Sequence, residues 1–198
     1  MARTDTRGGP LTRARISEVA TRLFLDRGFD AVTVADVARE AGVSSVTVFK
    51  HFPRKEDLLL DRVDDAVQLL RSAVRERPAD IDALTSLHDL TSQLADDRHG
   101  LSGLDGRSAP FFRTVAASAP LIARARELAA ELQQALAEEL DRDPRFRGDS
   151  DLLAAFFVAG YTTVLTENAR RCIAGQPTTA EDHLARLQRL FTALRNGL

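Results

Sequence analysis

A polar and cationic cluster between residues 44 and 51 holds the side chains best suited to binding chemistry in this chain of 198 residues. Spaced along a short helix, Val46 and Phe49 are expected to turn inward. The outward face is then small, polar or cationic and consists of Ser45, Thr47, Lys50 and His51. Short hydroxyls and a lysine can reach base edges and phosphates of a DNA major groove without steric conflict, so the predicted ligand is duplex DNA.

Two short helices and a tight turn must position this face. Thr33 and Asp36 have the spacing of a capping box, which predicts a helix start. Gly42 can leave that helix through the left-handed region, and Ser44 or Ser45 can cap the second helix. The pattern is a helix-turn-helix. A surface pair of helices with ordinary capping is the alternative interpretation of these residues.

The residues after the second helix favour the DNA-binding interpretation. In HFPRKEDLL a proline forces a break, and Arg54 and Lys55 then open a new helix. Cations at a helix start oppose the macrodipole, which makes sense if a phosphate lies alongside. Residues 1–55 carry a net charge of +4 and residues 56–198 carry −6, so the basic excess coincides with the motif.

The chain from about residue 12 to 60 closely resembles the TetR family of bacterial repressors. The family signature runs from a capped helix through A-G-V-S, an aromatic-x-His-Phe and x-x-Lys-Glu-x-Leu, and it is present here in order. The resemblance implies a phosphate contact for Thr33, recognition-helix contacts for Thr47 and Lys50, a backbone contact for His51 and a phosphate anchor for Lys55. The full set of expected DNA-binding residues is Thr33, Ser44, Ser45, Thr47, Phe49, Lys50, His51 and Lys55.

Phe49 departs from the family pattern, since many members have tyrosine at that position. The missing hydroxyl removes one possible phosphate hydrogen bond. Phe49 is therefore expected to pack first and to contact DNA second.

The rest of the chain predicts an all-α protein with three parts, because no strand pattern or repeat occurs. Residues 1–11, with two glycines and a proline, are expected to form a flexible arm. Residues 12–54 form the three-helix DNA-binding domain, starting with a helix capped by Thr12. Residues 55–198 form a helical ligand-binding and dimerisation domain, beginning with a long helix from Lys55 to about Arg77.

Several protein classes are disfavoured by the composition. The single cysteine, Cys172, allows no intramolecular disulfide, and no signal peptide or apolar run of membrane-spanning length is evident, so a cytoplasmic protein without membrane partners is expected. The four histidines lack metal-ligand spacing, and there is no phosphate loop or nucleophile elbow. No metal, cofactor or enzymatic activity is predicted.

The C-terminal domain is expected to serve dimerisation and regulation. The helices over residues 150–174 and 179–196 have more apolar surface than one protomer needs, which predicts a homodimer through a four-helix bundle. The resemblance implies an apolar or amphipathic small effector that tilts the helix from Lys55. The aromatic and leucine faces favour a hydrophobic ligand, and residues 99–108, with three glycines, are expected to form a mobile entry loop. Candidate lining residues, each with an apolar body and a polar tip or an aromatic ring, are His88, Phe112, Phe157, Tyr161 and Asn168.

The alternative function is a DNA-binding architectural or cell-division factor on the same fold, without an effector. An enclosed cavity in the C-terminal domain would distinguish the two, because a structural protein would tend to fill its core. The regulator interpretation predicts a pseudo-palindromic operator bound by a homodimer.

Overall fold

The computed structural model describes residues 8–104, 108–176 and 178–196, and these are helical with no strand. The α-helices are α1 (Gly8–Arg27), α2 (Val34–Glu40), α3 (Ser45–His51), α4 (Val63–Arg75), α5 (Ala83–Asp96), α6 (Ser108–Ala116), α7 (Ala119–Arg142), α8 (Ser150–Ile173) and α9 (Ala180–Asn196). Two short 3₁₀ helices join them, η1 (Glu56–Leu58) and η2 (Gly100–Ser102). The expected all-α class is confirmed.

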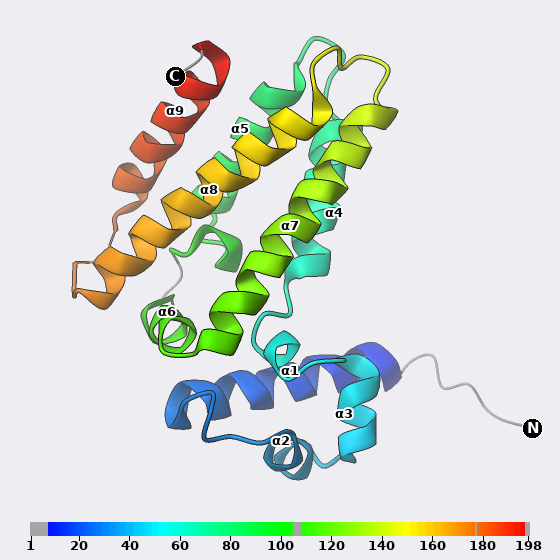
Figure 1. Cartoon of the computed structure of the whole chain (residues 1–198), viewed down its shortest axis with the longest axis vertical. Coiled ribbons are helices and arrows are strands. Elements are labelled where there is room, and N and C mark those ends of the chain that lie inside the picture. Colours follow the sequence, from blue (N-terminus) through cyan, green and yellow to red (C-terminus); the bar gives the residue numbers. More distant parts are fainter. Residues whose placement is uncertain (1–7, 105–107, 177, 197–198) are drawn as a thin grey trace, which may run out of the picture. The chain divides into compact units, whose positions relative to one another are not determined.

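The chain divides into two compact units. Unit 1 consists of residues 1–61 together with residues 114–124, and unit 2 consists of residues 62–113 and 125–198. In unit 1, α1, α2 and α3 contact one another and η1 contacts α1 (Figure 1). Its core includes the fully buried side chains of Ile16, Phe24, Phe52 and Leu58. This small helical body is the part that positions the predicted DNA-binding residues.

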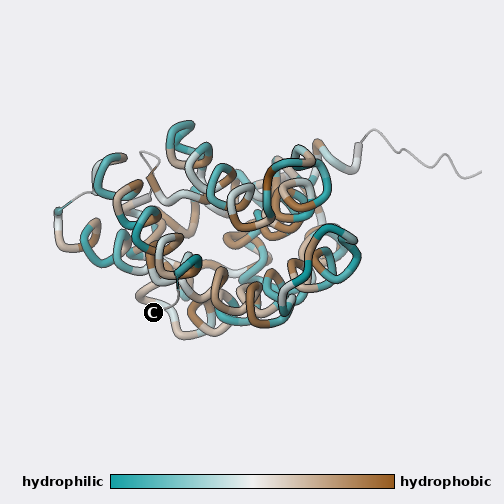
Figure 2. Tube along the Cα trace, turned by 90° about the horizontal axis from the view of Figure 1, so that it is seen from above, coloured by the Kyte–Doolittle hydropathy of each residue, from teal (hydrophilic) through white to brown (hydrophobic). Residues whose placement is uncertain are grey.

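Unit 2 is a helical bundle in which α5 packs against α4 and α9, and α8 packs against α9 (Figure 1). Polar and apolar residues alternate along its helices (Figure 2), as expected for helices that each bury one face. Its core centres on Leu87, Leu136, Phe157, Leu187 and Phe191. At Gly160 a Cβ atom would collide with Leu190, so the small residue permits the close approach of α8 and α9.

The helix ends largely follow the chemistry of the sequence. Asp82 caps α5 by accepting a hydrogen bond from the Thr85 amide at 2.8 Å, and Asp149 caps α8 by accepting from the Leu152 amide at 2.9 Å. Pro120 lies in the first turn of α7, where its missing N–H leaves no hydrogen bond unmade. The predicted helices over residues 150–174 and 179–196 correspond to α8 and α9.

Two predicted boundaries differ from the structure. Helix α1 already includes Gly8, so residues 8–11 are helical rather than a flexible arm; residues 1–7 lie outside the described range. The predicted long helix from Lys55 is interrupted, since only η1 and a turn precede the start of α4 at Val63. Leu58 and Leu59, in and directly after η1, are both buried in unit 1.

The C-terminal end of α4 is fixed by two arginines. Arg77 donates to the Ile81 carbonyl at 3.0 Å, and Arg145 donates to the Arg77 carbonyl at 3.0 Å and to the Val74 carbonyl at 3.3 Å. Arg77 also pairs with the buried Asp143. The carbonyls left over at this helix end therefore find partners in the loop between α7 and α8.

Helix α8 is long and apolar enough to cross a membrane by length and composition, which differs from the expectation that the chain holds no such run. Only 28% of that apolar stretch is buried within the chain. Leu152 and Phe156, one turn apart, are 53% and 57% exposed. Long helices buried in a soluble protein or in a subunit interface can have the same composition. The exposed apolar surface therefore indicates that something covers it, but does not identify the partner.

Candidate DNA-binding site

The capping box predicted at the start of α2 is present. The Asp36 amide donates to the Thr33 hydroxyl at 3.1 Å, and the Thr33 amide donates to the Asp36 carboxylate at 3.0 Å. The Thr33 hydroxyl also donates to Asp36, and the bonds from Thr33 and Arg39 lower the pKa of Asp36 to about 2. The hydroxyl proton of Thr33 thus already has an anionic acceptor, with which a DNA phosphate would have to compete.

The turn between α2 and α3 has the predicted backbone. Gly42 has a φ of 65°, in the left-handed region that glycine adopts without the steric cost of a Cβ atom. The Val43 amide donates to the Ala38 carbonyl at 2.9 Å, which closes the end of α2. The chain then continues directly into Ser44, the N-cap residue of α3.

Ser44 caps α3 and pairs with Thr47. The Ser44 hydroxyl accepts from the Thr47 amide at 3.1 Å, and the two hydroxyl oxygens are 2.9 Å apart. Only one hydroxyl proton can lie between two oxygens, so the pair has one further O–H group to offer outward. Thr47 and Ser45 are half-buried, whereas Ser44 is exposed.

The orientation of α3 corrects one prediction, because Val46 and Phe49 do not turn inward. They are 78% and 50% exposed, whereas Val48 and Phe52 are 0% and 1% exposed. Val48 and Phe52 are four residues apart and form the buried face of this helix. The outer face of α3 therefore combines Lys50 and the hydroxyl groups with two apolar side chains.

Lys55 lies within unit 1 rather than standing out from it. Its ammonium donates to the Phe29 carbonyl at 2.7 Å and lies 4.1 Å from the centre of the Phe29 ring. The Phe24 ring centre is 5.8 Å away. Since an ammonium has three donors, a phosphate contact is still compatible with this geometry, but the side chain also joins the start of η1 to the end of α1.

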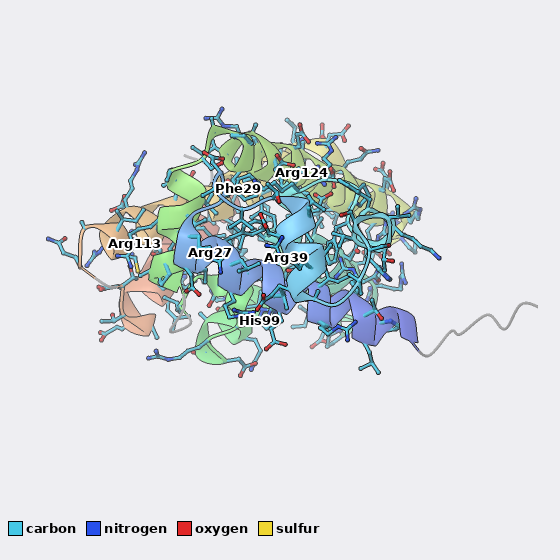
Figure 3. All side chains as sticks on the ribbon, turned by 90° about the horizontal axis from the view of Figure 1, so that it is seen from below. Arg27, Phe29, Arg39, His99, Arg113 and Arg124 are labelled. Atoms are coloured by element: carbon cyan, nitrogen blue, oxygen red, sulfur yellow. The ribbon has the colours of Figure 1, made fainter. Side chains whose placement is uncertain are left out.

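Charged residues surround the α2 and α3 helices. Figure 3 views the molecule from below, with Arg27 at the end of α1 and Arg39 on α2. Arg22 and Glu40 link α1 to α2 through an exposed ion pair of 2.9 Å, and this bond lowers the pKa of Glu40. Lys50 is exposed and His51 half-buried at the end of α3. The motif thus offers cations without a catalytic arrangement.

A second segment of unit 1, residues 114–124, was not anticipated from the sequence. Arg124 donates to Asp57 at 2.8 Å, and both side chains are mostly buried. Ser118 donates to Asp30 at 3.4 Å. No sequence signal predicts these contacts, because the paired positions are 67 and 88 residues apart.

Three of the five predicted ligand-binding residues lie along one chain of aromatic rings in unit 2. His88 contacts Phe191 edge-on with ring centres 4.8 Å apart, Phe191 is 6.0 Å from Phe157, and Phe157 stacks on Tyr161 at 6.2 Å. The Tyr161 hydroxyl donates to the Leu101 carbonyl at 3.2 Å, and burial raises the pKa of the phenol. These rings fill the interior by packing on one another.

The other two candidates lie elsewhere in unit 2. Phe112 contacts Phe111 and closely approaches Gly103, in the predicted entry loop, of which residues 105–107 lie outside the described range. Asn168 is buried and bonded to His183 Nδ1 at 2.6 Å, while Arg186 donates to its carbonyl oxygen at 3.1 Å. The structure therefore does not bring the five candidates together around one cavity.

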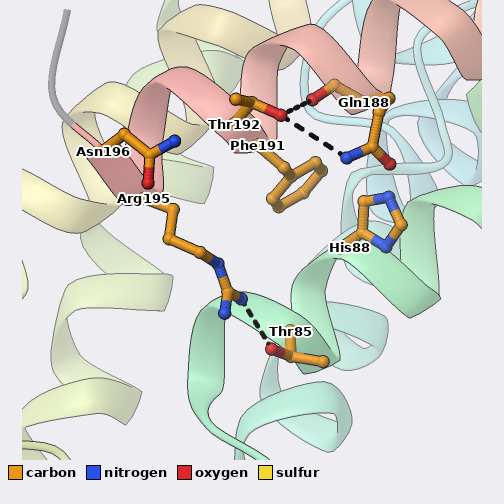
Figure 4. Close-up of a pocket in the computed structure, with 7 residues that line it drawn as sticks. All are labelled: Thr85, His88, Gln188, Phe191, Thr192, Arg195 and Asn196. Atoms are coloured by element: carbon orange, nitrogen blue, oxygen red, sulfur yellow. Dashed lines mark hydrogen bonds between the residues drawn. The ribbon is translucent and has the colours of Figure 1, made fainter.

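A surface pocket of about 190 Å³ opens between α5 and α9 beside His88 (Figure 4). Phe191 forms its apolar wall, and Arg195 reaches across it to the Thr85 hydroxyl at 2.7 Å. A larger pocket of about 650 Å³ lies beside the end of α4 and the loop after α7. Among the described residues no group of three or more His, Cys, Asp or Glu side chains could hold a metal ion.

The capped α2, the glycine turn and the exposed α3 define a helix-turn-helix unit of the DNA-binding class. Residues 16–61 match the model of the bacterial regulatory proteins of the tetR family. This match covers the helix-turn-helix region and agrees with the resemblance found in the sequence.

Proteins similar to this chain include curated transcriptional regulators and solved structures with the same fold. The transcriptional regulator TcmR of Streptomyces glaucescens is 28% identical over 77% of this chain and 69% of its own length. Another curated relative, an uncharacterised regulator of Haemophilus influenzae, is matched over only 35% of its length. Two solved structures share the fold, each with a TM-score of 0.60. NalD, the secondary repressor of the MexAB-OprM multidrug efflux pump in Pseudomonas aeruginosa, is 17% identical over 94% of this chain and 97% of its own. A complex of SmeT with triclosan is 20% identical over 92% and 91%.

Proposed function

We propose that this protein is a cytoplasmic, homodimeric transcriptional repressor that binds a pseudo-palindromic DNA operator and releases it in response to a small molecule. The observation that carries the proposal is the exposed face of α3, with Lys50 outward on a helix whose other side is fixed by Val48 and Phe52. A short rigid helix with such a face fits a major groove.

The DNA contacts are assigned to residues of both helices of the motif. Lys50, Thr47 and Ser45 face base edges, and Thr33, His51 and Lys55 lie toward the phosphates. Whichever of the Ser44 and Thr47 hydroxyls accepts their mutual bond donates its own proton to DNA. Phe49 packs against the DNA. Each lysine-phosphate contact releases a counterion, so affinity falls steeply as salt rises.

Dimerisation is assigned to α8 and α9. The exposed Leu152 and Phe156 lie on a helix only partly covered within one chain, and twofold symmetry would pair each such patch with its copy. Two α3 helices then enter successive major grooves when they are held about 34 Å apart. A helix apolar enough for a bilayer is accounted for by this subunit interface.

Binding of duplexes selected from a random pool tests the DNA-binding assignment. The full-length chain is expected to enrich a pseudo-palindromic site, and Lys50→Ala is expected to relax the preferred sequence at one base pair per half-site, by about 1 to 3 kcal/mol of discrimination. Arg126→Ala, on the exposed surface of α7 in unit 2, is the matched loss of one cation and should leave the preference unchanged. Equal sequence preferences for Lys50→Ala and the wild type contradict the assignment.

The effector is assigned to unit 2, where a small molecule acts by binding the DNA-incompetent spacing of the dimer more tightly than the competent one. The similarity to a protein solved with triclosan supports a hydrophobic compound. We assign the effector to the pocket between α5 and α9, which combines an aromatic wall, Phe191, with polar groups, His88 and Arg195. Since the end of α4 is held by Arg77 and Arg145, a tilt of α4 would pivot there.

One observation favours the second candidate function, a DNA-binding factor without an effector. Phe157 and Tyr161, expected to line a cavity, instead stack on each other, and Phe157 is only 2% exposed. A packed interior is what a structural protein needs. A thermal-shift screen of hydrophobic metabolites followed by operator release distinguishes the two, because only the repressor loses DNA on binding a compound.

A further inference from the structure

The outward face of α3 carries apolar surface that none of the assigned polar contacts would cover. Val46 is 78% exposed and Phe49 is 50% exposed. Three positions apart on a helix, the two side chains are neighbours on one face. When α3 docks in a groove, these side chains must either meet apolar groups of the DNA or leave a gap.

The DNA major groove offers one apolar group on its base edges, the C5-methyl of thymine. We propose that Val46 specifies a thymine in each half-site by packing against this methyl group, with the Phe49 ring beside it. The inference rests on the proposed function, because it requires α3 to lie in the major groove.

The polar residues on and before α3 are poorly suited to specify a thymine, which favours Val46 for this role. Serine and threonine hydroxyls bond equally well to donors and acceptors on different bases, so they discriminate weakly. Here the hydroxyls of Ser44 and Thr47 also bond to each other. Direct specification of sequence then falls to Lys50, which suits the acceptors of guanine, and to Val46, which suits thymine.

Charge favours DNA over a second copy of the chain as the cover of this face. Residues 1–55 carry a net charge of +4, and exposed Lys50 lies one position after Phe49. Two such faces would repel each other, whereas the phosphates flanking a groove attract them. The surrounding cations thus attract the apolar pair to duplex DNA, whose thymines present methyl groups in the major groove.

Replacement of thymine by deoxyuridine tests the proposal, because it removes only the methyl group. Duplexes enriched by the full-length chain from a random pool are resynthesised with one thymine at a time replaced. We expect one position in each half-site to lose about fourfold in affinity, the factor for one buried methyl-sized group. In Val46→Ala the difference between thymine and deoxyuridine at that position should fall to less than twofold.

A matched control removes exposed apolar surface elsewhere in unit 1. Leu11 is 76% exposed on α1, so Leu11→Ala should fold normally and keep the fourfold difference. An enriched site at which every deoxyuridine binds like thymine overturns the inference alone, as does a Val46→Ala variant with an undiminished difference. A pool without enrichment overturns the proposed function as well. A change in sedimentation of free Val46→Ala also counts against the inference, since it would assign the face to a second copy.

Discussion

Replacement of Lys55 by methionine separates an internal role of this lysine from a phosphate contact. Methionine keeps a flexible apolar stem but removes the ammonium, which donates to the Phe29 carbonyl at 2.7 Å and lies 4.1 Å from the Phe29 ring centre. A hydrogen bond from a charged donor contributes about 1.5 to 3 kcal/mol, and a cation-π contact at a partly exposed site adds about 0.5 to 1.

Part of this loss is offset, because a methionine sulfur on an aromatic ring recovers about 0.3 to 1.5 kcal/mol. We therefore expect Lys55→Met to lower the free energy of unfolding by about 1 to 3 kcal/mol, measured by urea denaturation of the full chain in the absence of DNA. Lys50→Met, at an exposed position on α3, is the matched control and should change stability by less than about 0.5 kcal/mol. If Lys55→Met unfolds at the same urea concentration as the control, the internal contact contributes nothing and the lysine serves DNA alone.

Three shorter predictions address the dimer, the turn and the effect of pH. Phe156→Glu should raise the dimer dissociation constant by about 100-fold or more in analytical ultracentrifugation, because each copy loses about 3 kcal/mol of buried aromatic surface, whereas Ala130→Glu on the exposed side of α7 should not. Gly42→Ala should cost about 1 to 2 kcal/mol in thermal unfolding because φ is 65° there, in contrast to Gly9→Ala, which meets no neighbouring atom and has no such backbone. Burial and Arg186 lower the pKa of His183 below its ordinary value of 6.5, so the contribution of His183 to stability is full above pH 6.5 and declines as pH falls toward the folded pKa. His183→Gln should therefore flatten the pH dependence of the free energy of unfolding in that window. An equally steep pH profile in the variant would contradict this role.

Local chemistry was the part of the fold that the sequence predicted well. The capping box of Thr33 and Asp36, the turn at Gly42 and the serine cap of α3 each depend on residues within a few positions of one another. Such interactions are encoded in the spacing itself, which is why the helix-turn-helix and most helix ends were recovered.

The orientation of α3 shows what spacing alone does not determine. The helix has seven residues, and Val46, Val48 and Phe49 are all apolar. Two turns give too few positions to fix which side is buried, so the decision falls to contacts with the rest of unit 1. The pair Val48 and Phe52 would have indicated the buried side, had the helix been extended to its cap.

The predicted ligand-binding residues failed to converge for a different reason. Aromatic side chains with polar tips are as suitable for a packed core as for a cavity, and only their neighbours decide between the two. Phe157 stacks on Tyr161, and the Tyr161 hydroxyl donates a hydrogen bond to the Leu101 carbonyl at 3.2 Å. Composition cannot predict the contact of Phe157 on α8 with Phe191 on α9, or the bond from Tyr161 to Leu101 in η2.

Unit 1 draws on two separate stretches of chain, and this affects how the protein can be recombined with others. A chimera that transplants only residues 1–61 would leave Asp57 without Arg124 and Asp30 without Ser118. Residues 114–124 have to be transplanted together with residues 1–61, or the recipient protein must supply equivalent partners. To exchange DNA specificity between relatives, it is therefore simpler to substitute residues of α3 than to replace residues 1–61 as one segment.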